Sequence, residues 1–308
     1  MIIVKQILKI LGFVLGGFVV LYAILFIISL LLLKKQTLPA FYSFGSKKVI
    51  LAHQGGEGEY PSNTKIAFEH AYEAGSDVLD TDMHMTSDGV LVLAHDDTLE
   101  GRTNGTGLIA DKTLAELQQL DFAYNWSQDG GSTFPYRGQG IGVYTLEQLF
   151  ADFPAVKFGI EIKPSKSEAA SKFCDMIKQF HYEEKTLVSD VDQTSMNAFR
   201  KACPTVATSA TKSETTKFYI FQKLGLSGLY HPPFSSLQVP EKQGSLTILS
   251  KSFIKNAHKW NLQVYPWTID TPEQAQHFYE MGADGVNTSY PWRIIDWQNN
   301  SHYVPPTN

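Results

Sequence analysis

The sequence has few cysteines and no concentration of charge of either sign. It contains two cysteines in 308 residues, and neither Cys174 nor Cys203 belongs to a CxxC pair or a Cys/His cluster, which argues against a thiolate metal site. Both lie in segments with a helical pattern, so we expect buried thiols, with a disulfide as the alternative. The net charge of −5 is spread along the chain, and no basic run exceeds two residues. Nucleic acid is therefore not expected as a partner.

One segment lacks charge altogether. Residues 10–33 contain no Asp, Glu, Lys or Arg, and as a helix they would be about 36 Å long, enough to cross a bilayer. The run is longer than the apolar part of a secretory signal, so we predict a retained single membrane span. Residues 1–9 would be an N-terminal flank and 34–47 a tether. The lysines on both sides do not fix the orientation, and we favour an extracytoplasmic position for the rest of the chain.

After residue 47, short apolar runs alternate with helical segments. Repeated βα units with short connections predict an α/β fold, a TIM (β/α)8 barrel over residues 48–297, with a C-terminal tail at 298–308. The expected strands are 49–53, 78–82, 90–95, 157–163, 186–189, 206–209, 229–231, 263–269 and 285–287. This is one strand too many, and 229–231 is the weakest. No helix separates the second strand from the third, so either a parallel return or a hairpin joins them.

The intervening segments have helix signals at their starts. Helices are expected at 65–74, 113–120, 146–152, 166–179, 213–223, 250–260 and 272–281, with another after the capping residue Asp192. Residues 121–144 form a long loop rich in aromatic residues and glycine, and a loop of this length in a compact domain is usually functional or disordered.

Three of the early strands end on ionisable side chains: His53, the pair Asp80 and Asp82, and His95. A buried strand end of this kind requires a polar pocket, and a shared pocket with two imidazoles and two carboxylates predicts a metal-assisted acid/base site. Asp80 and Asp82 are two residues apart and so face the same side of their strand. Their oxygens favour Mg²⁺ or Ca²⁺. The alternative is an exposed edge strand with solvated acids.

A second strand repeats this spacing with Glu161 and Lys163. Glu161 is a candidate third carboxylate ligand, and Lys163 a fixed cation for an anionic oxygen. The alternative is a structural ion pair. Histidines titrate near neutral pH, so His53 and His95 are candidate acid and base. Trp267, at another strand end, lines the pocket or belongs to the core.

These motifs, in this order, resemble the glycerophosphodiester phosphodiesterase family, a TIM barrel related to phosphatidylinositol-specific phospholipase C. The resemblance covers about residues 48–293. The motifs that carry it are His53-Gln54-Gly55, Pro61-Ser62-Asn63-Thr64, Asp80-Thr81-Asp82, His95-Asp96, Glu161-Ile162-Lys163, Trp267-Thr268 and the glycine-rich stretch 282–291.

The resemblance implies a role for each matching residue. The glycerol hydroxyl next to the phosphodiester would attack first, forming a cyclic phosphate that water then opens. Asp80, Asp82 and Glu161 would bind a divalent cation, Mg²⁺ or Ca²⁺. His53 and His95 would be the acid/base pair. Gln54, Lys163 and Trp267 would bind the substrate.

The chain departs from the family pattern at three positions. Gln54 stands where the family has arginine, and a neutral amide grips phosphate less strongly than a guanidinium. Asp80 and Ser62 replace glutamates, with Glu57 and Glu59 just upstream as candidate substitutes for the latter. Both histidines remain, so an enzyme is expected, and the alternative is an inactive barrel that binds phospholipid or a partner. The membrane span and the aromatic loop resemble a lysophospholipase D-type subset, which adds lysophospholipids to glycerophosphodiesters as expected substrates.

Overall fold

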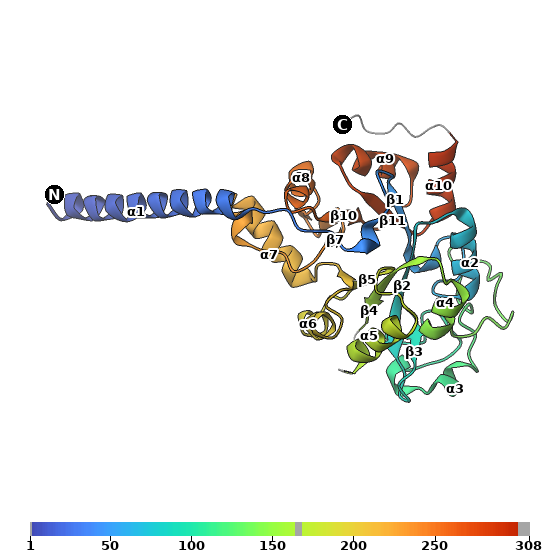
Figure 1. Cartoon of the computed structure of the whole chain (residues 1–308). Helices are drawn as coiled ribbons and strands as arrows, with labels where there is room; N and C mark the ends of the chain where they lie inside the picture. The colour runs from blue at the N-terminus through green and yellow to red at the C-terminus, as the bar shows by residue number, and fades with distance from the viewer. Residues whose placement is uncertain (1, 164–167, 301–308) are drawn as a thin grey trace.

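The structure is a computed structural model that describes residues 2–163 and 168–300. A long helix, α1 (Ile2–Leu32), projects from a body of strands surrounded by helices (Figure 1). The helix begins earlier than the predicted span 10–33. The start of the predicted helix 166–179 and the tail beyond residue 300 lie outside the described residues.

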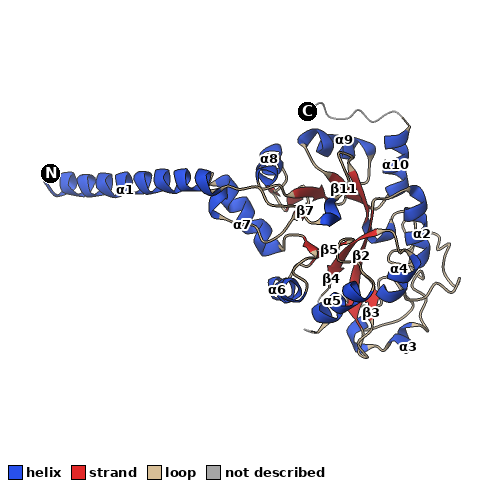
Figure 2. Ribbon diagram, in the orientation of Figure 1, coloured by secondary structure: helices blue, strands red, loops and turns tan. Residues whose placement is uncertain are grey.

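The body contains the parallel strands of a TIM barrel (Figure 2). Hydrogen-bonded pairing gives the order β11-β1-β2-β4-β5-β6, and β7 pairs with β10. A bridge between Ser209 and Ser236 joins β6 to β7. The Ile269 N–H donates to the Asn287 oxygen at 2.9 Å, which joins the β10 end of the ring to β11. The parallel strands are β1 (Val49–Ala52), β2 (Val78–Met85), β4 (Lys157–Ile162), β5 (Thr186–Ser189), β6 (Ala207–Thr208), β7 (Ser236–Val239), β10 (Gln263–Pro266) and β11 (Gly285–Thr288). The predicted fold is confirmed.

Helices cover the outside of the ring, and threonines begin several of them. Thr64, Thr145, Thr211 and Thr271 each accept a hydrogen bond from a backbone N–H of the first turn, as N-cap residues do. The helices are α2 (Lys65–Ala74), α3 (Leu114–Leu117), α4 (Leu146–Asp152), α5 (Ala169–Gln179), α6 (Gln193–Ala202), α7 (Lys212–Lys223), α8 (Lys251–Lys259), α9 (Pro272–Met281) and α10 (Pro291–Asn299). Short 3-10 turns are η1 (Ala40–Tyr42), η2 (His53–Gly55), η3 (Ile109–Asp111) and η4 (Ser227–Leu229).

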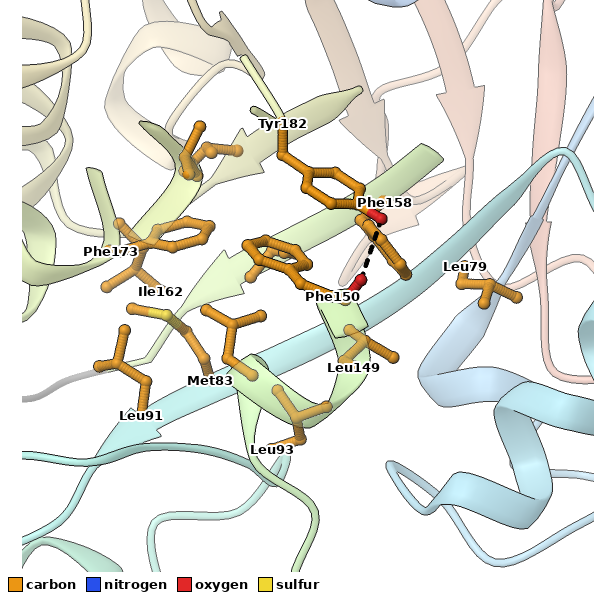
Figure 3. Packing of buried hydrophobic residues seen from close by; sticks show 14 of the residues in the cluster. Leu79, Met83, Leu91, Leu93, Leu149, Phe150, Phe158, Ile162, Phe173 and Tyr182 are labelled. Carbon is orange, nitrogen blue, oxygen red and sulfur yellow. Dashed lines mark hydrogen bonds between the residues drawn. The ribbon is translucent and has the colours of Figure 1, made fainter. Parts of the chain in front are cut away.

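Aromatic side chains fill the layer between β4 and the helices outside it (Figure 3). The rings of Phe150 and Tyr182 stack with centroids 4.3 Å apart, and Phe158 packs beside both. The buried Tyr182 hydroxyl donates to the Phe153 carbonyl at 2.6 Å. Burial of each large apolar side chain contributes about 1.5–3 kcal/mol, and the satisfied hydroxyl avoids the penalty of a buried unpaired group.

The predicted tether 34–47 packs against the barrel instead of hanging free. Phe41 is fully buried with Val49, Leu51 and Tyr265 near the N-terminal ends of the strands. Lys157 Nζ donates to the Phe41 carbonyl at 2.6 Å. The segment therefore connects α1 to the barrel through an ordered contact, because its aromatic residues cover the apolar end of the barrel interior.

Two strand predictions need correction. The segment 229–231 is not a strand: η4 ends there, and the strand that the barrel uses is β7, Ser236–Val239. The expected strand 90–95 is the short β3 (Leu91–Leu93), which pairs antiparallel with the end of β2, so the link is a hairpin. A second hairpin, β8 (Lys242–Gln243) with β9 (Leu246–Thr247), follows β7.

The expectation of two free thiols is also wrong. Cys174 in α5 and Cys203 just after α6 form a disulfide. Both cysteines are buried in the same outer core. Sequence pattern alone could not decide this, because the pairing depends on α5 and α6 lying side by side.

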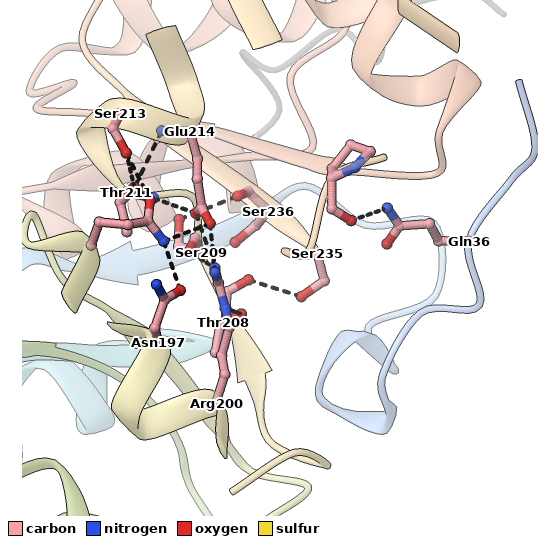
Figure 4. Close-up of polar contacts among 12 residues, drawn as sticks. Gln36, Asn197, Arg200, Thr208, Ser209, Thr211, Ser213, Glu214, Ser235 and Ser236 are labelled. Carbon is pink, nitrogen blue, oxygen red and sulfur yellow. Dashed lines mark hydrogen bonds and ion pairs between the residues drawn. The ribbon is translucent and has the colours of Figure 1, made fainter. Parts of the chain in front are cut away.

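An ion pair between the partly buried Arg200 and the buried Glu214 joins α6 to α7 (Figure 4). Arg200 on α6 donates to Glu214 on α7 at 2.6 Å and also to Thr208 Oγ1 at 3.0 Å. Glu214 additionally accepts the Thr211 N–H at the start of α7. Removing one partner of such a pair leaves a buried charge without compensation, so the position of α7 is firmly determined.

Candidate active site

The sharp turn after β1 places His53 at the C-terminal end of that strand. Gln54, Gly55 and Gly56 have φ values of 52°, 78° and 93°, in the left-handed region that favours glycine. A Cβ on Gly56 would lie 2.9 Å from Pro291 Cγ, so the close approach of α10 also requires glycine. The Gly56 N–H donates to the His53 oxygen at 2.8 Å and closes the turn.

His53 forms an ion pair with a carboxylate that follows it by one turn. His53 Nδ1 lies 3.1 Å from Glu57 Oε1. Burial opposes protonation of His53, but Glu57, Asp80 and Asp82 together outweigh it and raise the pKa of the imidazole. Burial would raise the pKa of Glu57, but His53 and Arg102 outweigh this effect and lower the pKa of the carboxyl to about 2. Glu57 is thus ionised and able to orient His53.

The hairpin places His95 at the same mouth of the barrel. The Ala94 N–H donates to the backbone carbonyl oxygen of Asp82 at 3.1 Å, which holds the chain after β3 beside β2. His95 Nδ1 then lies 2.9 Å from Asp96 Oδ1. Burial would raise the pKa of Asp96, but His95 and Arg102 lower it. His95 therefore has an ionised carboxylate partner, as His53 does.

Arg102 joins the two histidine–carboxylate pairs. Its Nη2 donates to Glu57 Oε2 at 3.1 Å, and its Nε lies 3.5 Å from Asp96 Oδ2. A continuous chain of contacts, His53–Glu57–Arg102–Asp96–His95, results, and we call it the histidine chain. Arg102 follows no strand end, so nothing in the sequence around it indicates these contacts. The spacing of Glu57 four residues after His53 was the available signal.

The carboxylates on β2 face the same part of the barrel as His53. Asp82 pairs in register with Glu161 of β4, so their side chains lie on one face. Asn287 on β11 donates to Asp80 Oδ2 at 2.9 Å. Burial raises the pKa of Asp80 to about 7, and the charges of Asp82 and Glu161 act in the same direction. A cation near these groups would lower the free energy needed to ionise Asp80 beside the other two carboxylates.

Lys163 is the cation that the structure places among these acids. Its Nζ lies 3.1 Å from Asp82 Oδ1 and 3.0 Å from Glu161 Oε1. Within residues 2–163 and 168–300, no group of three or more His, Cys, Asp or Glu is gathered closely enough to hold a metal ion. The expected ligands thus share a face and have the hard oxygens that Mg²⁺ and Ca²⁺ prefer, but two of them are paired with Lys163.

The two remaining predicted substrate residues differ in environment. Gln54 is buried, and its Oε1 has no hydrogen-bond partner among the described residues. Trp267 is exposed at the end of β10 and lines a hollow with Glu241 and His277. His95 lines a different hollow, together with Ser62, Asp96, Arg102 and Phe122. Trp267 and His95 therefore line different hollows.

Comparison with known proteins identifies the family. A model of the glycerophosphoryl diester phosphodiesterase family matches residues 53–292. The chain belongs to this family. The glycerophosphodiester phosphodiesterase of Caldanaerobacter subterraneus subsp. tengcongensis is 28% identical over 258 residues, which cover 81% of this chain and 97% of that protein. Lysophospholipase D GDPD1 of Homo sapiens is 25% identical over 323 residues, covering 93% and 95%.

Solved structures share the fold. An Oleispira antarctica phosphodiesterase, in complex with the product sn-glycerol-3-phosphate, superposes with a TM-score of 0.65 at 21% identity, covering 82% of this chain and 96% of that one. The family relationship makes this protein a phosphoric diester hydrolase on a TIM barrel. Members of the family generally use a divalent cation.

Proposed function

We propose that the protein hydrolyses glycerophosphodiesters or lysophospholipids, with His53 and His95 as the acid/base pair. The observation that carries this proposal is the histidine chain, which gives each imidazole an ionised carboxylate on Nδ1. A carboxylate beside Nδ1 stabilises the protonated ring and leaves Nε2 for proton transfer. At His95 this contact is a hydrogen bond, whereas at His53 it is an ion pair without hydrogen-bond geometry.

The two histidines then have complementary tasks. One takes the proton of the glycerol hydroxyl next to the phosphodiester as that oxygen bonds to phosphorus. The other gives a proton to the departing head-group oxygen as its bond to phosphorus breaks, which leaves a cyclic phosphate. The roles reverse when water adds to phosphorus and one ring oxygen takes back a proton. Glu57 and Asp96 stabilise whichever imidazolium is present, because they remain ionised at neutral pH.

The acidic face is proposed to hold the cation. Asp80, Asp82 and Glu161 would bind Mg²⁺ or Ca²⁺, which supplies charge neutralisation for the phosphodiester and its transition state. Lys163 would hold a phosphoryl oxygen, and its ammonium is already fixed by two acids of this face. Gln54 and Trp267 are proposed to contact substrate, and the exposed ring of Trp267 supports a contact at the edge of the mouth.

The substrates are proposed from the relatives. The similarity to a human lysophospholipase D supports lysophospholipids. The similarity to glycerophosphodiester phosphodiesterases, and the glycerol 3-phosphate bound by the Oleispira structure, supports water-soluble glycerophosphodiesters. For the latter, the expected products are glycerol 3-phosphate and a free head-group alcohol.

We further propose that α1 anchors the chain in a membrane and that the barrel lies on the extracytoplasmic side. α1 is long and apolar enough to span a bilayer, although a signal sequence passes the same test. The disulfide between Cys174 and Cys203 supports the extracytoplasmic side, because disulfides persist in oxidising compartments. Proteolysis of intact and opened cells distinguishes the sides: a barrel digested only after the cells are opened would contradict this orientation.

The decisive assay follows the products of the full-length protein in detergent. Glycerophosphocholine and a lysophospholipid are supplied with Mg²⁺, with Ca²⁺ or with a chelator, and phosphorus NMR identifies the products. We expect metal-dependent release of head group and, from glycerophosphocholine, glycerol 3-phosphate. Accumulation of cyclic phosphate as the end product would indicate a phospholipase C-like lyase. Binding of metal without turnover of any substrate would favour the inactive barrel.

A further inference from the structure

The C-terminal part of α1 is attached to one corner of the barrel, formed by the end of α7 and η4. Figure 1 shows the rest of α1 extending away from the body beyond α7. We call residues 220–229 the α7 corner. The Tyr22 hydroxyl donates to the Leu224 carbonyl at 2.8 Å, and the Gly228 N–H donates to Ser29 Oγ at 2.8 Å. A Cβ on Gly228 would lie 1.7 Å from the Ser29 carbonyl oxygen, so the two backbones touch.

These two contacts use every hydrogen-bonding side chain of the apolar run. Between residues 10 and 33, Tyr22 and Ser29 are the only residues whose side chains carry a donor or acceptor. Each satisfies a backbone group of the α7 corner, one carbonyl and one N–H. Backbone groups exposed to lipid must be paired because no water is present to pair them. These two hydrogen bonds therefore satisfy backbone groups of the α7 corner that would otherwise be unpaired in a lipid environment.

The depth of the corner follows from the charges that flank the run. Lys5 and Lys9 disfavour a membrane span that begins nearer the N-terminus, because such a span would bury a lysine in the hydrocarbon at a high cost in free energy. About 20 residues cross the hydrocarbon, so a span that starts after Lys9 ends near Ser29. Tyr22 lies seven residues before Ser29, about 10 Å along the helix axis. Leu224, whose carbonyl accepts the hydrogen bond from Tyr22, would then lie within the hydrocarbon layer.

The outer surface of the corner has the composition of a segment that lies in a membrane surface. Ile220 and Leu224 are 48% and 49% exposed, although they are large and apolar. Lys217 and Lys223 are exposed on the same helix, and lysines beside an apolar patch extend their charges toward lipid head groups. The Arg200–Glu214 ion pair holds α7 firmly, so the patch is presented by a rigid element.

We propose that the α7 corner inserts into the lipid bilayer beside α1, so that the barrel is seated on the membrane by two elements instead of tethered by one. The inference rests on the proposed anchoring by α1. It does not depend on the catalytic roles of His53 and His95, whose turnover of a water-soluble glycerophosphodiester is measured separately.

Single labelled cysteines in the full-length chain test the proposal. Ile220→Cys and Leu224→Cys are labelled with an environment-sensitive fluorophore and reconstituted in phosphatidylcholine nanodiscs that contain nitroxide lipids. The control is Tyr72→Cys on α2, which is 53% exposed and lies across the barrel from α7 (Figure 1). The native cysteines are joined in a disulfide and do not compete for label.

We expect blue-shifted emission and severalfold stronger nitroxide quenching at positions 220 and 224 than at 72. Adding Tyr22→Phe and Ser29→Ala should reduce the quenching at 224 while the chain remains in the nanodisc. Quenching at 220 and 224 no greater than at 72 would overturn the insertion. A mature protein whose mass lacks α1 would overturn both the anchoring and the insertion, and intact turnover of glycerophosphocholine in that sample would leave the catalytic proposal standing.

Discussion

The two histidine–carboxylate pairs have the same chemistry but different surroundings. The side chains of His53 and Glu57 are 20% and 23% exposed, whereas those of His95 and Asp96 are each 39% exposed. His53 also faces the acidic residues Asp80 and Asp82, which help to raise its pKa. His95 lies on a hairpin at the edge of the mouth. The same pair of residue types is therefore more shielded from solvent at His53 than at His95.

This difference suggests a division of labour in the first step. The carboxylates around His53 favour its protonated form, which suits a general acid, and the more exposed His95 suits the base. A divalent cation on Asp80 and Asp82 would remove part of the field on His53, leaving Glu57 as its main partner.

Loss of either imidazole should have the largest effect. His53→Ala and His95→Ala should each lower kcat by about 10²- to 10⁴-fold, the usual contribution of a positioned acid or base. The matched control is His258→Ala, since His258 also pairs with an aspartate, Asp284, at 3.0 Å but on α8, outside the barrel mouth. Steady-state kinetics on glycerophosphocholine measure the effect. A comparable loss in the control would show that the assay reports folding instead.

Removal of each carboxylate charge should separate the two pairs by pH. Glu57 raises the pKa of His53, so Glu57→Gln should move the His53 limb of the pH–rate profile to lower pH. Asp96→Asn should move the profile less, because Asp96 lies in a more exposed pair. Profiles of kcat for both variants are compared with wild type. Equal displacement in the two variants would remove the proposed asymmetry.

The same substitution affects stability with a definite sign. The pKa of Glu57 is depressed to about 2 in the folded protein. Its contribution to stability is therefore present above the ordinary glutamate pKa and is lost as pH falls toward 2. Urea unfolding of wild type and Glu57→Gln should show a difference at neutral pH that shrinks under acid conditions. A difference that does not change with pH would contradict the assigned ionisation.

Arg102 should have an intermediate effect because it contacts both carboxylates. Arg102→Met removes charged hydrogen bonds of about 1.5 kcal/mol, which corresponds to about tenfold in kcat. Since Arg102 is proposed to position Glu57 and Asp96, KM should change little. Arg102→Lys should restore part of the rate by keeping the charge. A large rise in KM with unchanged kcat would instead indicate that Arg102 binds the substrate phosphate.

The candidate site was predictable from sequence only where a residue marks the end of a strand. His53, Asp80, Asp82 and Glu161 follow or complete apolar runs, and the barrel places their strands side by side. The histidine chain was not predictable, because Arg102 contacts Glu57 across a sequence separation of 45 residues. The pairing of Lys163 with Asp82 was hidden for the same reason.

The fold was predictable from the alternation of strands and helices, with errors where the pattern was short. β7 was missed because its four residues follow Pro232, Pro233, Phe234 and Ser235, and two of the four, Ser236 and Gln238, are polar. Nothing in the sequence of the tether 34–47 shows that Phe41 is buried against the barrel. The disulfide depends on the packing of α5 against α6.

The disulfide should have the smallest effect on activity, because it joins two outer helices away from both histidine pairs. Replacing Cys174 and Cys203 with serine should reduce the free energy of unfolding by about 3–4 kcal/mol, from the loop entropy of the 29-residue separation. The kcat measured well below the melting temperature should be unchanged. A loss of kcat similar to that of Arg102→Met would mean that the bond also shapes the mouth.

The central claim is that His53 and His95 act as one acid/base pair, and a double-variant cycle tests it most directly. Turnover of glycerophosphocholine is measured for wild type, His53→Ala, His95→Ala and the double variant under the same metal conditions. Residues that act as a unit have strongly non-additive effects, so we expect the double variant to be about as slow as either single variant. Independent, multiplying losses, or one histidine that can be removed without effect, would contradict the account.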